Sequence, residues 1–248
     1  MAVQQVFKRY EKKYLLTESQ EKEFLKELNG RMIMDKYGRH TICNIYFDTV
    51  DFDLIRTSLE KPLYKEKLRL RTYGVPETDE HTAFVEIKKK FEGIVYKRRE
   101  SMSLKEAEDY LYRGIHPQKD SQIIREIDWF LKVHPVKPRV CLTYERRAFY
   151  EDGNPQFRMT LDQNITCRDY RLSLTEGVFG DTIIPEGSSL LEIKIPGIMP
   201  MWMSLILSKL KIYPVSISKY GRYYKNTEAL NKQVNVRCRS LKLKEKAN

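Results

Sequence analysis

The segment KEKLRLRTYG at residues 65–74 places Lys67, Arg69 and Arg71 two positions apart, with leucines between them. Alternate side chains of a β-strand point to the same face, so the three cations would line one face and the leucines would pack outward beneath a helix. A guanidinium binds phosphate oxygens through parallel hydrogen bonds, and an ammonium binds them as a point charge. The spacing therefore indicates contact with a phosphorylated ligand.

Other alternating segments repeat this pattern of charge. Cations share one face in further groups, sometimes with a glutamate among them: Arg9, Glu11 and Lys13; Glu86, Lys88 and Lys90; Lys97 and Arg99. For any single strand, a solvated face of a β-sandwich is the simpler interpretation. Taken together, the strands predict a closed barrel whose lumen is lined by lysine and arginine. Like charges in such a lumen repel one another unless a polyanion lies between them.

The elements that must position these residues are mainly strands. Period-two alternation predicts eight of them, at residues 6–16, 40–49, 65–73, 82–90, 93–101, 139–150, 157–165 and 189–197. Capping boxes at Thr17 with Gln20 and at Ser103 with Glu106 predict two helices, and helical spacing of apolar residues predicts two more at 121–133 and 200–213. We expect an α+β fold, an eight-stranded antiparallel β-barrel with helices packed on the outside. Residues 1–230 would form one domain, and residues 231–248 a basic tail.

The overall composition restricts the class of partner. A net charge of +11 favours an anionic ligand. Nucleic acid is disfavoured, because cations on the inner face of a barrel are badly placed to contact a duplex. The longest apolar run, at residues 198–207, is about half of the ~20 residues that a membrane span needs, so we expect no membrane insertion. Four widely spaced cysteines indicate a reduced, cytoplasmic protein.

An ordered set of motifs carries a family resemblance. From residue 7 to residue 225 the chain reads FKRYEKKY, NIYFDT, KLRLRTYG, FVEIKKK, GIVYKRR, YERRAF, RMTLDQNI, LLEIKIPG and SISKY. This set resembles the VTC polyphosphate polymerase domain, a branch of the triphosphate tunnel metalloenzyme superfamily. The resemblance implies a basic tunnel that binds ATP or another nucleoside triphosphate, together with inorganic polyphosphate, tripolyphosphate or pyrophosphate. It also implies a divalent metal ion, Mn²⁺ or Mg²⁺, on the phosphates.

The resemblance assigns roles to individual residues. The catalytic cations would be Lys13, Arg69, Arg71, Lys88, Arg146 and Arg158. Further cations would bind substrate, with Lys67 supported by strand parity alone: Arg9, Lys67, Lys97, Arg99, Lys194 and Lys219. Glu192 would be the metal carboxylate. Glu11 and Glu86 are either second metal ligands or salt-bridge partners of the neighbouring cations. One departure is Ser216, where the family commonly has a second lysine three residues before the last one.

Several charged or aromatic residues are expected to be structural. Arg98 and Arg147 have the opposite parity to their neighbours, which predicts ion pairs on the outer face. Asp48 is expected to cap a strand end or the next helix. The tyrosines of the last segment, Tyr220, Tyr223 and Tyr224, are expected to pack a helix.

The sequence leaves three functions open. The first is a polymerase that transfers the γ-phosphate of ATP to a phosphate chain. The second is a hydrolase of tripolyphosphate or nucleoside triphosphates, for which the first strand has one glutamate fewer than the ExExK signature of hydrolytic relatives. The third is a binder of polyphosphate that catalyses nothing.

Overall fold

The computed structural model describes residues 10–28, 30–92 and 94–229. Arg9 and the basic tail at residues 231–248 lie outside the described residues. No helix in the described ranges is long and apolar enough to cross a bilayer.

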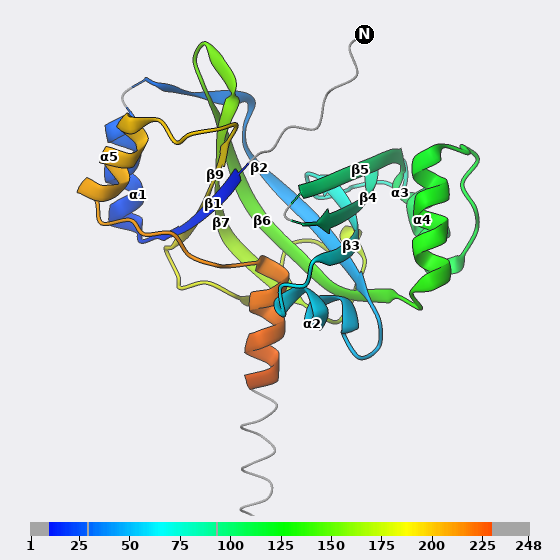
Figure 1. Ribbon diagram of the computed structural model, residues 1–248. Coiled ribbons are helices and arrows are strands. Elements are labelled where there is room, and N and C mark those ends of the chain that lie inside the picture. The colour runs from blue at the N-terminus through cyan, green and yellow to red at the C-terminus, as the bar shows by residue number, and fades with distance from the viewer. Residues whose placement is uncertain (1–9, 29, 93, 230–248) are drawn as a thin grey trace, which may run out of the picture.

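One antiparallel sheet organises the chain (Figure 1). Its spatial order is β1-β9-β7-β6-β2-β3-β4-β5, and a two-residue strand, β8, pairs with β7. All eight strands expected from the alternation are present. With β8 included, the strand bounds are β1 Tyr10–Leu16, β2 Met32–Asp48, β3 Tyr64–Tyr73, β4 Thr82–Phe91, β5 Ile94–Ser103, β6 Lys137–Glu151, β7 Asn154–Arg168, β8 Asp181–Thr182 and β9 Ser189–Ile195.

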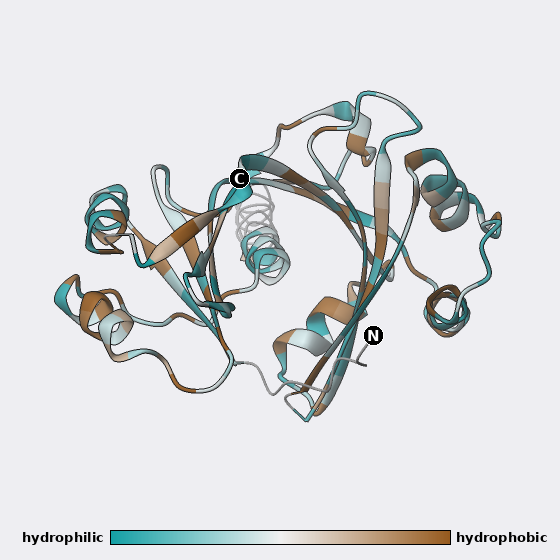
Figure 2. Cartoon of the chain, turned by 90° about the horizontal axis from the view of Figure 1, so that it is seen from above, coloured by the Kyte–Doolittle hydropathy of each residue, from teal (hydrophilic) through white to brown (hydrophobic). Residues whose placement is uncertain are grey.

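The sheet curls so that its two halves face one another across a central region (Figure 2). The expected α+β fold with eight main antiparallel strands is therefore confirmed, but no ladder joins the edge strands β1 and β5 within the described ranges. Both edges carry charged residues, among them Glu11 and Lys12 on β1 and Arg98 and Arg99 on β5. Charged edge strands resist pairing, which agrees with an open seam at this place.

The four expected helices are present. They are α1 Glu18–Leu28, α3 Leu104–Arg113, α4 Gln122–Val133 and α5 Met201–Lys209. Thr17 and Gln20 form the reciprocal bonds of a capping box, and the Ser103 hydroxyl accepts a hydrogen bond from the Glu106 N–H. Three further helical segments were not predicted: α2 Asp53–Leu59, the 3₁₀ turn η1 Leu174–Glu176, and a helix at residues 219–229.

Helices cover the outer face of each half of the sheet (Figure 1). α3 and α4 pack on β2, β3 and β4, where Leu68 and Leu70 are fully buried in one apolar cluster, as the alternation predicts. α1 and α5 pack on β1, β9 and β7 around a second cluster that includes Phe24 and Ile193. The helices leave the opposite, inner face of the sheet to the residues of the other parity.

A third apolar cluster lies on the inner face itself. It joins Ile42 and Leu142 of the sheet to Ile55 of α2 and to Tyr220 and Tyr223 of the 219–229 helix. These two short helices lie together beneath the sheet in Figure 1. The expectation that the tyrosines pack a helix is confirmed for the two buried ones. The inner face is therefore apolar at the end that these helices cover.

Asp48 holds this end together. Its Oδ1 accepts hydrogen bonds from the N–H groups of Thr49 at 2.8 Å and Leu54 at 2.9 Å. Its Oδ2 accepts one from the Ile55 N–H at 3.0 Å and one from the Tyr220 hydroxyl at 2.8 Å. The carboxylate thus caps α2, as expected, and also fastens the 219–229 helix to it.

We expect Asp48→Ala to destabilise the fold by about 3 kcal/mol, because it removes a helix cap and leaves buried donors without an acceptor. Tyr220→Phe removes only one of the four bonds and should cost about 1 kcal/mol. Urea unfolding followed by circular dichroism measures both values. Equal losses in the two variants would contradict the capping role.

Candidate phosphate-binding site

The arginines of β3 are held by partners on three neighbouring strands. Arg71 is nearly fully buried, and its Nε donates to the Asn44 Oδ1 at 2.8 Å while its Nη2 donates to the Tyr144 hydroxyl at 3.1 Å. Arg69 donates from Nη1 to the Tyr46 hydroxyl at 3.2 Å. Because these partners hold each guanidinium in place, the orientation of its remaining N–H groups is fixed before a ligand binds.

Glu86 is the anion of this half of the sheet. The strand register places it directly opposite Arg69 of β3, and its side chain is 1% exposed. Its Oε2 lies 2.5 Å from the Arg69 Nε, and its Oε1 lies 2.7 Å from the Lys97 Nζ. Burial alone would raise the pKa of Glu86, but Arg69, Arg71 and Lys97 lower it to about 2. Glu86 is thus a salt-bridge partner of these cations. We call Glu86, Arg69, Arg71 and Lys97 the Glu86 cluster.

A second charged cluster lies on the other half of the sheet and contains Glu192. The Glu192 Oε1 lies 3.2 Å from the Lys13 Nζ and 3.1 Å from the Lys219 Nζ. Lys219 also approaches the Asp162 Oδ2 at 2.5 Å. Arg146 binds Asp162 through two hydrogen bonds of 2.7 Å each. These five residues, the Glu192 cluster, come from β1, β6, β7, β9 and the 219–229 helix.

Burial and charge act against each other in the Glu192 cluster. Burial would raise the pKa of Glu192, but Lys219, Lys13 and Arg146 hold it well below its usual range. Burial would lower the pKa of Lys219, but Asp162 and Glu192 raise it above the usual value. Every member is therefore charged at neutral pH, and three cations surround two carboxylates.

A row of lysines crosses β3, β4 and β5 beside the Glu86 cluster. The register places Lys67 opposite Lys88, and Lys88 opposite Lys97. For Lys67 and Lys88, no ion pair with a carboxylate is found in the described part of the chain. Burial, together with Lys88 and other lysines, lowers the pKa of Lys67 to about 8. Burial likewise lowers the pKa of Lys97 to about 8, against the attraction of Glu86.

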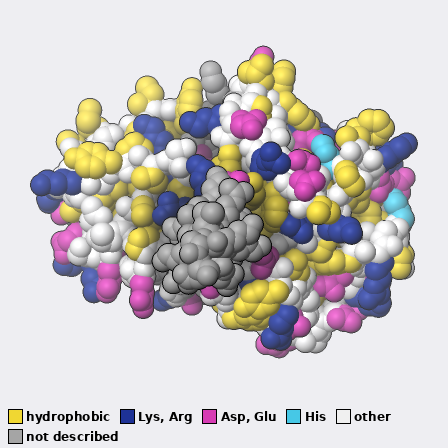
Figure 3. Space-filling model, turned by 90° about the horizontal axis from the view of Figure 1, so that it is seen from below, with side chains coloured by type: hydrophobic (Ala, Val, Ile, Leu, Met, Phe, Trp, Pro, Cys, Tyr) yellow, Lys and Arg dark blue, Asp and Glu magenta, His cyan; other side chains and the backbone are white. Residues whose placement is uncertain are grey.

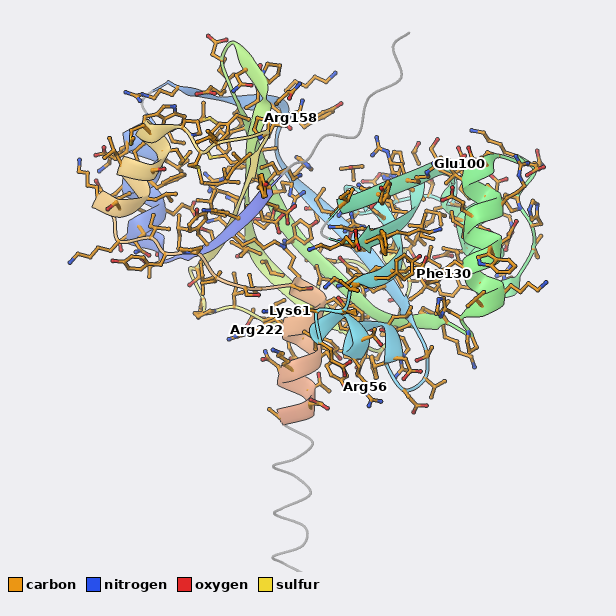
Figure 4. All side chains as sticks on the ribbon, viewed as in Figure 1. Arg56, Lys61, Glu100, Phe130, Arg158 and Arg222 are labelled. Carbon is orange, nitrogen blue, oxygen red and sulfur yellow. The ribbon has the colours of Figure 1, made fainter. Side chains whose placement is uncertain are left out.

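The other expected site residues are placed less centrally. Glu11 lies on the exposed part of β1, with its Oε1 3.3 Å from the Lys13 Nζ. Arg158 is exposed near the β6–β7 hairpin, where its Nε donates to the Pro155 carbonyl at 2.8 Å (Figure 4). The register places Lys194 between Glu11 and Arg158. Arg99 lies on β5 opposite Glu86. The structure does not bring Arg158 into either cluster.

The opposite parity gives ion pairs on the outer face, as expected. The Arg98 Nη1 lies 3.1 Å from the Glu126 Oε1 on α4, and Arg147 pairs with Glu21 on α1. On the lower face of the molecule, basic and acidic side chains are likewise interspersed (Figure 3). Opposite charges therefore alternate over this outer surface, whereas cations outnumber carboxylates on the inner face.

Sequence reasoning missed the uncharged partners of the site. Asn44, Tyr46 and Tyr144 were not selected, although they have the same parity as the residues that face inward on β2 and β6. Burial would raise the pKa of Tyr46, but Arg69, Arg71 and Lys67 lower it to about 8. Applying the parity argument to hydroxyl and amide side chains, and not to cations alone, would have found all three.

Comparison with known proteins identifies the family of the chain. The family model described as the VTC domain matches residues 8–227. The chain belongs to the VTC domain family. In a search of curated proteins, no sequence matches the chain.

Solved structures similar in fold to this VTC domain include two that are described as putative cyclases. A putative adenylate cyclase from Bacillus halodurans is 18% identical with a TM-score of 0.52, covering 84% of this chain and 92% of its own. A putative adenylyl cyclase from Hippeastrum, described as having a dominant triphosphatase activity, is 14% identical with a TM-score of 0.54, covering 87% and 95%. At these identities the likeness establishes the shared tunnel fold of the VTC domain.

A divalent ion fits Glu192 only in company with phosphate. In the described ranges, no three His, Cys, Asp or Glu side chains gather at one point. The Glu192 Oε1 is paired with the ammonium groups of Lys13 and Lys219. In the described ranges, the nearest ion-pair partner of its Oε2 is Arg146, at 3.9 Å. Oε2 thus has lone pairs available for one metal bond. Mg²⁺ and Mn²⁺ accept such a site when phosphate oxygens and waters supply the other ligands.

We expect the affinity of the VTC domain for tripolyphosphate to fall as the pH rises from 7 to 9. The pKa of Lys67 is about 8 in the free protein, so its ammonium is mostly charged at pH 7 and mostly neutral at pH 9. A bound polyanion favours the charged form, so this lysine alone should weaken binding about tenfold over that range. Isothermal titration calorimetry at both pH values measures the change.

The variant Lys67→Met isolates this effect, because it should remove about tenfold of the pH dependence. Lys132→Met, on the exposed surface of α4, is the matched control and should leave the dependence unchanged. If Lys67→Met retains the full pH dependence of the wild type, Lys67 does not titrate against the ligand.

Proposed function

We propose that this VTC domain is a polyphosphate polymerase: it transfers the γ-phosphoryl group of a nucleoside triphosphate to the end of a phosphate chain bound on the inner face of the sheet. Membership of the VTC domain family and the tunnel fold support an enzyme of this kind. In this proposal Mg²⁺ or Mn²⁺ accompanies the phosphates, and the protein acts in the cytoplasm.

The lysine row carries the proposal. Lys67, Lys88 and Lys97 stand directly opposite one another on three adjacent strands, a pairing that destabilises a sheet when nothing lies between the charges. A phosphate chain has a negative charge on each unit, and its spacing lets it contact several ammonium groups in turn. Bound along this row, it would turn a repulsion into a set of attractions.

The two clusters would divide the work of phosphoryl transfer. Transfer needs the groups aligned and the charge of the transferred phosphoryl neutralised, and it needs no covalent nucleophile from the protein. Arg69 and Arg71, fixed by Tyr46, Asn44 and Tyr144, would align the triphosphate. Lys13, Arg146 and Lys219 would hold the neighbouring phosphates. A divalent ion on the Glu192 Oε2 would neutralise charge that develops on the phosphate oxygens.

We expect purified protein incubated with ATP and Mn²⁺ to form polyphosphate chains longer than any phosphate compound supplied. Glu192→Gln preserves the size of the side chain but removes its charge, so chain synthesis should fall about a hundredfold or more. Gel electrophoresis of the products measures both. Glu126→Gln, an outer-face carboxylate on α4, is the control and should synthesise chains at the wild-type rate. Absence of any elongated product in the wild type would rule out the polymerase.

Nucleotide binding should depend on a guanidinium of the inner face and not on one of the outer face. We expect Arg69→Met to weaken binding of a nonhydrolysable ATP analogue at least tenfold, because a charge-assisted hydrogen bond to phosphate is lost. Arg98→Met, two strands away on the outer face, should change it less than twofold. Both constants come from calorimetry. Similar losses in both variants would mean that the parity of the strands does not define the site.

A triphosphate hydrolase is the second candidate, favoured by the triphosphatase activity described for the Hippeastrum protein. Water would then replace the phosphate chain as the acceptor at the same site. The product assay distinguishes the two, since a hydrolase releases inorganic phosphate from ATP or tripolyphosphate without forming longer chains. Binding of polyphosphate without turnover in either assay would identify a binding domain.

A further inference from the structure

Four aromatic side chains form a connected group next to the arginines of β3. Tyr37 and His40 have ring centroids 6.2 Å apart, and His40 and Tyr73 are also 6.2 Å apart. Tyr73 and Phe84 meet edge to face, with centroids 5.5 Å apart and an interplanar angle of 82°. We call these four residues the aromatic group.

The strand register places the aromatic group next to the phosphate-binding arginines. Tyr73 is two positions beyond Arg71 on β3, so it continues the row of side chains that face inward. Phe84 lies directly opposite Arg71 on β4. His40 precedes Ile42, the residue opposite Tyr73, by two positions on β2. A ligand lying along this face would thus pass from Arg69 and Arg71 onto rings.

Packing of the protein core does not account for the aromatic group. None of the four residues belongs to the three apolar clusters found in the described ranges. Tyr73 is 41% exposed and Tyr37 is 67% exposed. Such exposure of large rings within a cation-rich surface leaves apolar area that a flat ligand could cover.

Two guanidinium groups stand over the same rings. The Arg99 Cζ lies 4.7 Å from the Phe84 centroid, and the Arg71 Cζ lies 5.9 Å from the Tyr73 centroid. The Arg99 Nη1 also donates a hydrogen bond of 3.4 Å to the Tyr73 hydroxyl. Guanidinium planes and aromatic rings are the two kinds of surface on which nucleobases stack.

We propose that the aromatic group, with Arg99, is the subsite for the base of a nucleoside triphosphate whose phosphates contact Arg69 and Arg71. This inference rests on the proposed binding of a triphosphate on the inner face. Every base has a π-face, and stacking on aromatic rings is therefore tolerant of base identity. The subsite would distinguish a nucleotide from an inorganic phosphate chain, and it would distinguish one nucleotide from another only weakly.

The double variant Tyr73→Leu and Phe84→Leu tests the subsite, because it removes two rings and leaves every charge in place. Calorimetry without divalent metal ions would compare a nonhydrolysable ATP analogue with tripolyphosphate. We expect the affinity for the ATP analogue to fall at least about fivefold, and the affinity for tripolyphosphate to change less than twofold. Tyr73→Trp should retain binding of the analogue. Tyr213→Leu, an exposed tyrosine outside the aromatic group, is the matched control.

The two ligands distinguish the possible failures. Equal losses of affinity for the ATP analogue and for tripolyphosphate would overturn the base subsite, because the rings would then only support the structure of the phosphate site. An unchanged affinity for the analogue would overturn it too. A wild-type protein that binds neither ligand would overturn the proposed function and the subsite with it. Retained binding of tripolyphosphate by the double variant shows that it folds.

Discussion

Mutual repulsion among the cations of the inner face is the constraint to which the rest of the structure responds. Three buried carboxylates, Glu86, Asp162 and Glu192, hold the central cations in fixed positions. Each carboxylate contacts cations from more than one element, so it both neutralises charge and joins elements. Buried pairs of this kind contribute little net stability, because desolvation offsets much of their attraction. Their structural effect is to set where the charged groups point.

The distribution of carboxylates makes the two halves of the site different. In the Glu192 cluster, two carboxylates balance most of the charge of three cations, and the group is compact. Across β3, β4 and β5, the lysine row has only Glu86 nearby; burial lowers the pKa of Lys67, with neighbouring lysines adding to the effect, and burial lowers the pKa of Lys97 against the attraction of Glu86. Strain of this electrostatic kind is common where a protein is built to bind an ion of opposite charge. The charges of one half are therefore largely balanced within the protein, and in the proposed function a phosphate chain would balance those of the other.

Strand positions and the inward parity of the cations could be predicted from sequence, because both follow from a period of two that each strand displays locally. Leu68 with Arg69, and Arg98 with Lys97, illustrate how well this local signal separates the two faces. Features that depend on distant segments could not be predicted in the same way. The helix α2 has only seven residues, and its cap, Asp48, acts together with Tyr220 from the far end of the chain. Arg158 has the correct parity, but it lies beside a hairpin that takes it away from the centre.

The ladder between β1 and β9 joins residues 10–16 to residues 189–195, two segments that are far apart along the chain. Lys13 and Glu192 are paired directly in this ladder, and Lys219 follows later still. Contacts of such large sequence separation form slowly, since the loop between them must be closed first. The Glu192 cluster consequently cannot form in a chain that ends before Lys219. In the proposed function, the lysine row of β3, β4 and β5 is local in sequence, whereas the Glu192 carboxylate and its cations would come together only after β1, β9 and the 219–229 helix have met.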